Sequence, residues 1–119
     1  MIIDGKVSAI LIHVADVTEG IEWYAKAFPA AKRIYLDDFD FEYLLLGDIC
    51  LEIVPADEKV KSRQAGSVVY WECTDFQQAL NHFQTLGATL YRGSLAIQDN
   101  FKMCQVMDPW GNCIGLRGV

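Results

Sequence analysis

The pattern of apolar and polar positions repeats once along the chain, at an offset of 59 residues. An apolar run of strand length, 9–15, is closed by Asp16, and a second such run, 68–74, is closed by Asp75. Both runs are rich in β-branched or aromatic residues, which is typical of strands. The shared offset predicts that the chain consists of two similar halves.

A helix is predicted behind each closing Asp. A Glu or a Gln follows the Asp after three residues, which is the spacing of an N-terminal capping box. Apolar residues then recur at helical spacing, and Pro29 and Gly87 predict where the two helices end. The apolar stripes are Val17, Ile21, Tyr24 and Phe28 in the first half, and Phe76, Leu80, Phe83 and Leu86 in the second.

Three short strand-like runs follow each helix. Turns are predicted at 47–48 and 108–112, a loop at 91–100, and a charged linker at about 56–66. We therefore predict an α+β fold of two βαβββ modules, at about 6–55 and 67–119, within a single domain. The predicted strands are 33–36, 41–46 and 49–54 in the first half, and 89–92, 101–107 and 113–116 in the second.

Length and composition are those of one globular domain, with 119 residues of which 52% are hydrophobic and 22% charged. No apolar run approaches the roughly 20 residues that span a bilayer. The first residues lack the basic-then-apolar pattern of a signal peptide, so a cytoplasmic location is expected. The net charge of -6 disfavours binding to nucleic acid and to anionic membranes. The four cysteines form no C-x-x-C pair and are expected to be reduced.

Two motifs carry a resemblance to a known family. They are the strand–Asp–helix opening with Trp23-Tyr24 at its centre, and the ending D-P-W-G-N-C-I at 108–114. The chain resembles the vicinal oxygen chelate superfamily of glyoxalases, bleomycin-resistance proteins and dioxygenases, whose ending has the pattern D-P-x-G-N-x-I-E-L. The resemblance covers nearly the whole chain. It implies two modules whose curled mixed sheets surround a shared cleft, and a homodimer.

In the metal enzymes of that superfamily, four inward-facing side chains hold one divalent ion. The resemblance assigns these positions to Ala9, Glu52, Val68 and Gly115. Only the glutamate offers a donor atom, whereas a stable site for a divalent cation needs several oxygen or nitrogen ligands. We therefore expect no metal and no cofactor, although a strand shifted by one residue would present other side chains.

Alternation along the strands predicts which side chains face the cleft. Each candidate also has a structural alternative in packing, pairing or simple exposure. A buried carboxylate such as Glu52 needs a partner, for example His13 or Arg117. The candidate ligand-binding residues are His13, Glu52, Tyr70, Glu72 and Arg117, with Phe41, which shares a strand face with Phe39 and Tyr43, and Trp110 in the final turn.

Two functional hypotheses remain. The first is a small-molecule-binding protein of the glyoxalase/bleomycin-resistance type without a catalytic metal, in which buried apolar area supplies the affinity. The acidic net charge favours a neutral or cationic organic ligand. The second is an enzyme: either a metal-dependent lyase, isomerase or dioxygenase with a rearranged ligand set including Glu52 and His13, or a metal-free acid–base pair of His13 and Glu72. The sequence does not decide between them.

Overall fold

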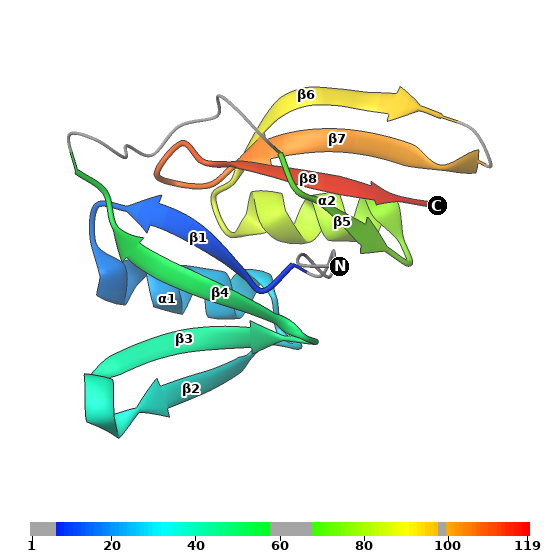
Figure 1. Cartoon of the computed structure of the whole chain (residues 1–119). Helices are drawn as coiled ribbons and strands as arrows, with labels where there is room; N and C mark the ends of the chain where they lie inside the picture. Colours follow the sequence, from blue (N-terminus) through cyan, green and yellow to red (C-terminus); the bar gives the residue numbers. More distant parts are fainter. Residues whose placement is uncertain (1–6, 58–67, 98–99) are drawn as a thin grey trace. The chain divides into compact units, whose positions relative to one another are not determined.

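The computed structural model describes residues 7–57, 68–97 and 100–119 (Figure 1). Contacts divide the chain into two units, Met1–Lys61 and Ser62–Val119. Each unit holds one module in the order strand, helix and three further strands, which confirms the predicted βαβββ repeat. Most of the predicted linker lies outside the described residues.

The first module is a four-stranded mixed sheet with one helix. The strand order is β1-β4-β3-β2, in which β1 runs parallel to β4 and the other neighbours are antiparallel. Helix α1 packs on one face of this sheet, against β4 and β3 (Figure 1). The elements are β1 (Ala9–Val14), α1 (Val17–Ala27), β2 (Lys32–Leu36), the 3-10 turn η1 (Asp37–Phe39), β3 (Phe41–Leu46) and β4 (Ile49–Pro55).

The second module has the same topology. Its strand order is β5-β8-β7-β6, with β5 parallel to β8 and antiparallel pairing elsewhere. Helix α2 packs against β8 and β7 on one face of the sheet. The elements are β5 (Tyr70–Cys73), α2 (Phe76–Thr85), β6 (Thr89–Ala96), β7 (Lys102–Met107) and β8 (Cys113–Gly118).

Both helices begin at the residues that the capping pattern predicts. The Asp16 side chain accepts the backbone N–H of Glu19 at 3.0 Å, and Asp75 accepts that of Gln78 at 3.0 Å. Each carboxylate satisfies an N–H that the first helical turn leaves without a backbone partner. The helices end just before the predicted proline and glycine. No helix in the described ranges is long and apolar enough to cross a bilayer.

Each module has its own core, between its helix and one face of its sheet. Alternate strand residues face the helix, and the residues between them face away. Burying one large apolar side chain stabilises a fold by about 1.5–3 kcal/mol. Val69, which alternation assigns to the core, is 39% exposed and lies just before β5. The largest fully buried side chains are Val14, Tyr24, Leu44, Leu51 and Ile53 in the first module, and Phe76, Val106 and Leu116 in the second.

Two sequence predictions are wrong in detail. The first part of the expected loop, 91–96, belongs to strand β6. Two register shifts against β7 interrupt the alternation of this strand, so the sequence does not show the usual strand pattern. Phe39 lies in η1 and is 77% exposed, so it does not share the strand face of Phe41.

Candidate functional site

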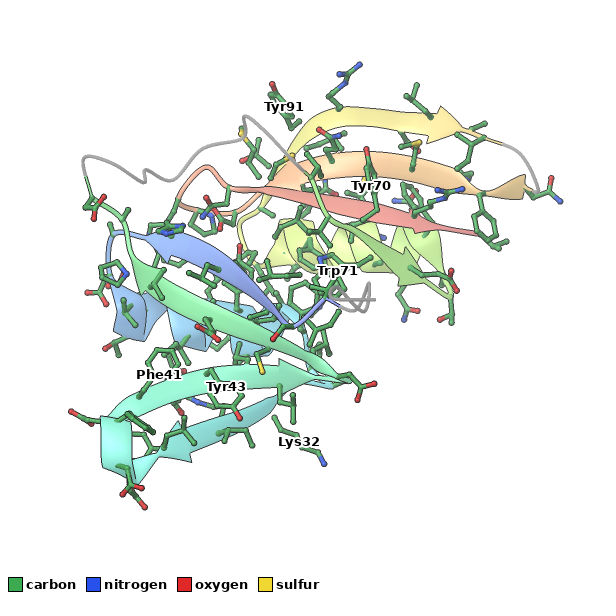
Figure 2. All side chains as sticks on the ribbon, in the orientation of Figure 1. Lys32, Phe41, Tyr43, Tyr70, Trp71 and Tyr91 are labelled. Atoms are coloured by element: carbon green, nitrogen blue, oxygen red, sulfur yellow. The ribbon has the colours of Figure 1, made fainter. Side chains whose placement is uncertain are left out.

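Within each module, one face of the sheet is turned away from the helix. Strand alternation places the predicted site residues of the strands on these two faces, because their neighbours along each strand point toward the helix. Figure 2 shows this for the second module, where Tyr70 and Trp71 extend to opposite sides of the sheet.

On the first sheet, Glu52 of β4 lies opposite Leu11 of β1, and His13 lies opposite Val54 two residues further along. Glu52 is half-buried, and in the described part of the chain it forms no ion pair or hydrogen bond. The strand pairing therefore brings Glu52 and His13 to one face without joining them directly.

Two aromatic rings lie on the same face of the first sheet. Phe41 and Tyr43 extend from β3, and their ring centroids are 6.3 Å apart at an interplanar angle of 23° (Figure 2). Both are half-buried, so part of each side chain is accessible. The face combines an aromatic surface with the carboxylate of Glu52.

The second sheet carries a more developed arrangement. Tyr70, Gly115 and Gln105 are direct cross-strand neighbours on β5, β8 and β7. The ring of Tyr70 lies over Gly115, and a Cβ added there would be 2.5 Å from Cδ1 of the ring. Because the glycine has no side chain, the tyrosine reaches across β8, where Gln105 Nε2 donates a hydrogen bond to its Oη at 2.7 Å.

This hydrogen bond belongs to a chain of three side chains. Cys113 Sγ donates to Gln105 Oε1 at 3.3 Å, and the amide nitrogen of Gln105 donates to Tyr70. Burial, and to a smaller extent the charge of Asp108, raises the pKa of the Cys113 thiol, which keeps it protonated as a donor. The Tyr70 oxygen accepts from Gln105, so its own O–H can donate to a further group.

A hollow of about 250 Å³ lies beside this chain on the same module. Arg92 and Leu95 reach it from β6, because the two register shifts place them opposite Gln105 and Met103. Gly93 lies between them with φ +90°, and a Cβ there would be 2.8 Å from the Met103 carbonyl oxygen. The lining residues are Tyr70, Arg92, Leu95, Met103, Cys104 and Gln105.

The polar groups of the hollow are mainly donors. Arg92 is exposed, and it forms no ion pair or hydrogen bond with any residue in the described ranges. Cys104 is 3% exposed and its side chain belongs to the core, where burial raises the pKa of the thiol to about 11, with a smaller contribution from Cys73. The lining therefore combines one cation with neutral polar and apolar groups.

Glu72 and Arg117 lie outside the lining of the hollow, although they share its sheet. They are cross-strand neighbours on β5 and β8, and both are exposed. The Arg117 guanidinium carbon is 5.9 Å from the ring centroid of Phe101, a cation–π distance. The structure thus places these two predicted residues together, next to the hollow in the strand register but not in its wall.

The D-P-W-G-N ending forms a turn around a buried carboxylate. Asp108 is 4% exposed and accepts the backbone N–H groups of Trp110 and Asn112, both at 2.8 Å. It also accepts Asn112 Nδ2 at 3.0 Å, and its own N–H donates to the Asn112 carbonyl at 2.8 Å. The motif therefore connects β7 to β8 as a structural turn. Trp110 is half-buried within that turn and does not line the hollow.

Of the residues predicted from the sequence, only Tyr70 lines the hollow. The sequence analysis missed Gln105 and Arg92. Gln105 could have been found, because it is the polar member of an alternating strand face between Met103 and Met107. Alternation does not identify Arg92, because the register shifts of β6 separate its position in the sequence from the face it occupies.

The residues at the four superfamily ligand positions do not fit a metal ion. Ala9, Val68 and Gly115 have no donor side chain, and the ring of Tyr70 occupies the space that a larger residue at 115 would need. In the described ranges 7–57, 68–97 and 100–119, no three His, Cys, Asp or Glu side chains gather where they could hold a metal.

Solved structures resemble this chain over almost its full length, whereas no protein-family model and no curated protein matches it. A glyoxalase/bleomycin resistance protein/dioxygenase family enzyme from Burkholderia phytofirmans has a TM-score of 0.76 at 14% identity, covering 94% of this chain and 97% of its own. The fosfomycin resistance protein FosX from Mesorhizobium loti has a TM-score of 0.72 at 15% identity, covering 98% of this chain and 93% of its own. FosX from Listeria monocytogenes, complexed with Mn(II) and sulfate, has a TM-score of 0.75 at 14% identity, covering 98% of this chain and 90% of its own. The chain therefore has the fold of the glyoxalase/bleomycin resistance/dioxygenase superfamily, which confirms the resemblance found in its sequence.

Proposed function

We propose that this protein binds a small organic molecule in the hollow of its second module, without a catalytic metal. The observation that carries the proposal is the hollow itself, in which Leu95 and Met103 offer apolar surface beside the polar groups of Tyr70, Gln105 and Arg92. Ligand sites in proteins typically combine an apolar wall with a few well-placed polar groups.

Hydrogen bonds within the protein hold the polar side chains of the hollow in place before a ligand binds. Gln105 holds the Tyr70 hydroxyl at 2.7 Å, and Cys113 in turn holds the amide of Gln105. Side chains that are already fixed lose little conformational entropy when a ligand binds. A binding role accounts for this polar chain at an accessible surface better than packing does, because packing needs no such orientation.

Metal chemistry is a weaker candidate for this chain. The Listeria protein was crystallised with Mn(II), but the ligand set that the resemblance assigns to such an ion is reduced here to Glu52. One fold supports many chemistries, so function has to be argued from the site. The side chains of the second sheet support recognition through hydrogen bonds and apolar contact.

The size of the hollow sets the scale of the ligand. A volume of about 250 Å³ equals roughly eight water molecules at about 30 Å³ each, so it suits a ligand of similar atom number. At about 0.5 kcal/mol for each non-hydrogen atom, such a ligand binds with a Kd of about 1 mM. A larger natural ligand that extends beyond the hollow gains affinity from the added contacts.

A screen of small organic molecules by amide NMR tests the proposal. We expect the ligands that bind to shift the resonances of Tyr70, Met103 and Gln105. Leu95→Trp fills the hollow and should abolish these shifts. Leu90→Trp is the matched control, because Leu90 is also exposed on β6 but pairs with Val106 on the helix-facing side. Binding that survives Leu95→Trp, or that maps away from the hollow, contradicts the proposal.

A further inference from the structure

The hydrogen-bonding capacity of the hollow names a class of ligand. Resting on the proposed function, the geometry points to an organic carboxylate. Its oxygens meet the Arg92 guanidinium and the Tyr70 hydroxyl, and its apolar body lies on Leu95 and Met103. This differs from the neutral or cationic ligand that the net charge alone favours.

The polar groups of the hollow are left mainly with donors, because each of its two side-chain acceptors already accepts one hydrogen bond. The carbonyl oxygen of Gln105 accepts from Cys113, and the oxygen of Tyr70 accepts from Gln105. The Tyr70 O–H and the N–H groups of Arg92 are left to donate, and a guanidinium has no acceptor at all. A ligand that satisfies these groups must present acceptors.

The charge distribution also permits an anion. Residues 1–61 contain six Lys or Arg and twelve Asp or Glu, whereas residues 62–119 contain four of each. The net charge of -6 therefore belongs to the first unit. In the second unit, the described residues that line the hollow include one cation, Arg92, and no carboxylate, so their net charge is positive.

A carboxylate fits this lining better than a phosphate group. One guanidinium balances one negative charge, and its planar fork matches the two oxygens of a carboxylate. A doubly charged phosphate would bring a second negative charge to a hollow in which Arg92 is the one cation among the described lining residues. Uncompensated charge is costly to remove from water. The apolar wall adds the requirement for a hydrocarbon body.

The test uses probes of nearly equal shape and different charge. Benzoate, benzamide and benzamidine each have about nine non-hydrogen atoms, which suits a hollow of this size. Amide NMR titrations of the full chain should show benzoate binding about tenfold more tightly than benzamide, because a charged hydrogen bond replaces a neutral one. Benzamidine, a cation, should bind most weakly, and phenylphosphonate more weakly than benzoate.

Variants of the lining assign the effect to named atoms. Arg92→Gln should lower the affinity for benzoate about tenfold and leave the affinity for benzamide nearly unchanged. Tyr70→Phe should weaken benzoate about threefold to tenfold through loss of one donor. Lys102→Gln is the matched charge control, because Lys102 precedes Met103 on β7 and extends to the opposite side of the sheet. It should leave both affinities unchanged.

The outcomes separate this inference from the proposed function. If benzamide binds in the hollow as tightly as benzoate, and Arg92→Gln has no effect, the carboxylate assignment is wrong but the binding function stands. Tighter binding of phenylphosphonate overturns the assignment in favour of a phosphate-like ligand. If none of the probes shifts the resonances of the hollow, both proposals fail.

Discussion

The two modules share one topology but differ at a corresponding pair of positions. On the first sheet, Leu11 of β1 faces Glu52 of the parallel strand β4, and on the second, Tyr70 of β5 faces Gly115 of β8. The first pair places a carboxylate beside an aliphatic side chain. The second leaves room for a phenol ring that reaches Gln105. The missing side chain at 115 is therefore what makes the second site possible.

The modules also differ in the polar contacts that connect their elements. In the first, Arg33 of β2 joins Glu42 of β3 at 2.9 and 3.1 Å and Glu22 of α1 at 3.1 Å. In the second, the buried carboxylate of Asp108 organises the hairpin of β7 and β8 through hydrogen bonds from Trp110 and Asn112. Exposed charged side chains thus connect two strands and the helix of the first module, whereas a buried acceptor organises a hairpin turn in the second.

The largest effect is expected from placing in the second module the carboxylate that the first one has. Gly115→Glu should destabilise the protein by about 3 kcal/mol, because the new side chain collides with the Tyr70 ring and brings a charge to a buried position. Urea unfolding measures the loss. Adding Tyr70→Ala should restore part of the stability, since it removes the collision.

The reciprocal change in the first module is the control. Glu52→Gly removes a half-buried carboxylate that forms no ion pair in the described ranges, so the free energy of unfolding should change by about 1 kcal/mol or less. Equal losses from Glu52→Gly and Gly115→Glu would show that the two positions do not differ as described.

Substitutions in the hairpin turns of the two modules should also differ in their effect on the free energy of unfolding, but by a smaller amount. Asp108→Ala removes the acceptor of three hydrogen bonds and should lower the free energy of unfolding by about 2 kcal/mol. Asp48→Ala, in the exposed turn between β3 and β4, should change it by less than about 0.5 kcal/mol. Thermal unfolding compares the two variants. A loss at Asp48 as large as that at Asp108 would contradict the structural role of the D-P-W-G-N turn.

Removing the middle of the hydrogen-bonded chain should have a moderate effect. Gln105→Leu keeps the size of the side chain but leaves the Tyr70 hydroxyl and the Cys113 thiol without their partner, which should lower stability by about 1 kcal/mol. The same variant should weaken the binding of benzoate, because Tyr70 is no longer held in place. Unchanged binding would show that Gln105 does not orient the tyrosine.

The smallest effect concerns the exposed ion pair of the first module. The hydrogen bond from Arg33 lowers the pKa of Glu42 below its usual value of 4.5. A lowered pKa stabilises the folded state above the unfolded value, and this stabilisation is lost as the pH falls through the folded pKa. Because both groups are accessible to solvent, the contribution is expected to stay below about 1 kcal/mol.

Glu42→Gln tests this contribution. At pH 7, urea unfolding should show the variant to be slightly less stable than the native protein, and the difference should shrink toward zero as the pH is lowered well below 4.5. Glu22→Gln, which affects the more exposed partner of Arg33, should give a smaller difference at pH 7. A difference for Glu42→Gln that grows in acid would contradict the sign of this linkage.

Much of the fold could be predicted because local sequence determines it. Asp16 and Asp75 each begin a helix through a hydrogen bond of their own side chains. In strands with regular alternation, such as 41–46, the sequence itself shows which residues face the core. The strand β6 escaped prediction beyond 92 because its bulges depend on the neighbouring strand. The spacing of apolar residues depends on one segment alone, whereas the register of a strand depends on its partner strand as well.

The site was harder to predict than the fold. Alternation placed Tyr70 on the correct face, but nothing in the sequence says that its ring lies over Gly115 and meets Gln105. That contact joins three strands, and Tyr70 is 35 residues away from Gln105 in the chain. His13, Glu72 and Arg117 share a face with their predicted neighbours, yet a common face does not by itself form a pocket.

The irregular strand β6 has a consequence for how the specificity of this site could be changed. Its two register shifts place both Arg92 and Leu95 in the wall of the hollow, although an odd number of steps separates them. Since a bulge can re-aim side chains while the rest of the sheet stays paired, inserting or deleting one residue near Gly93 would exchange the side chains that a ligand meets. Strand length, rather than substitution, would then be the simplest route to a different ligand.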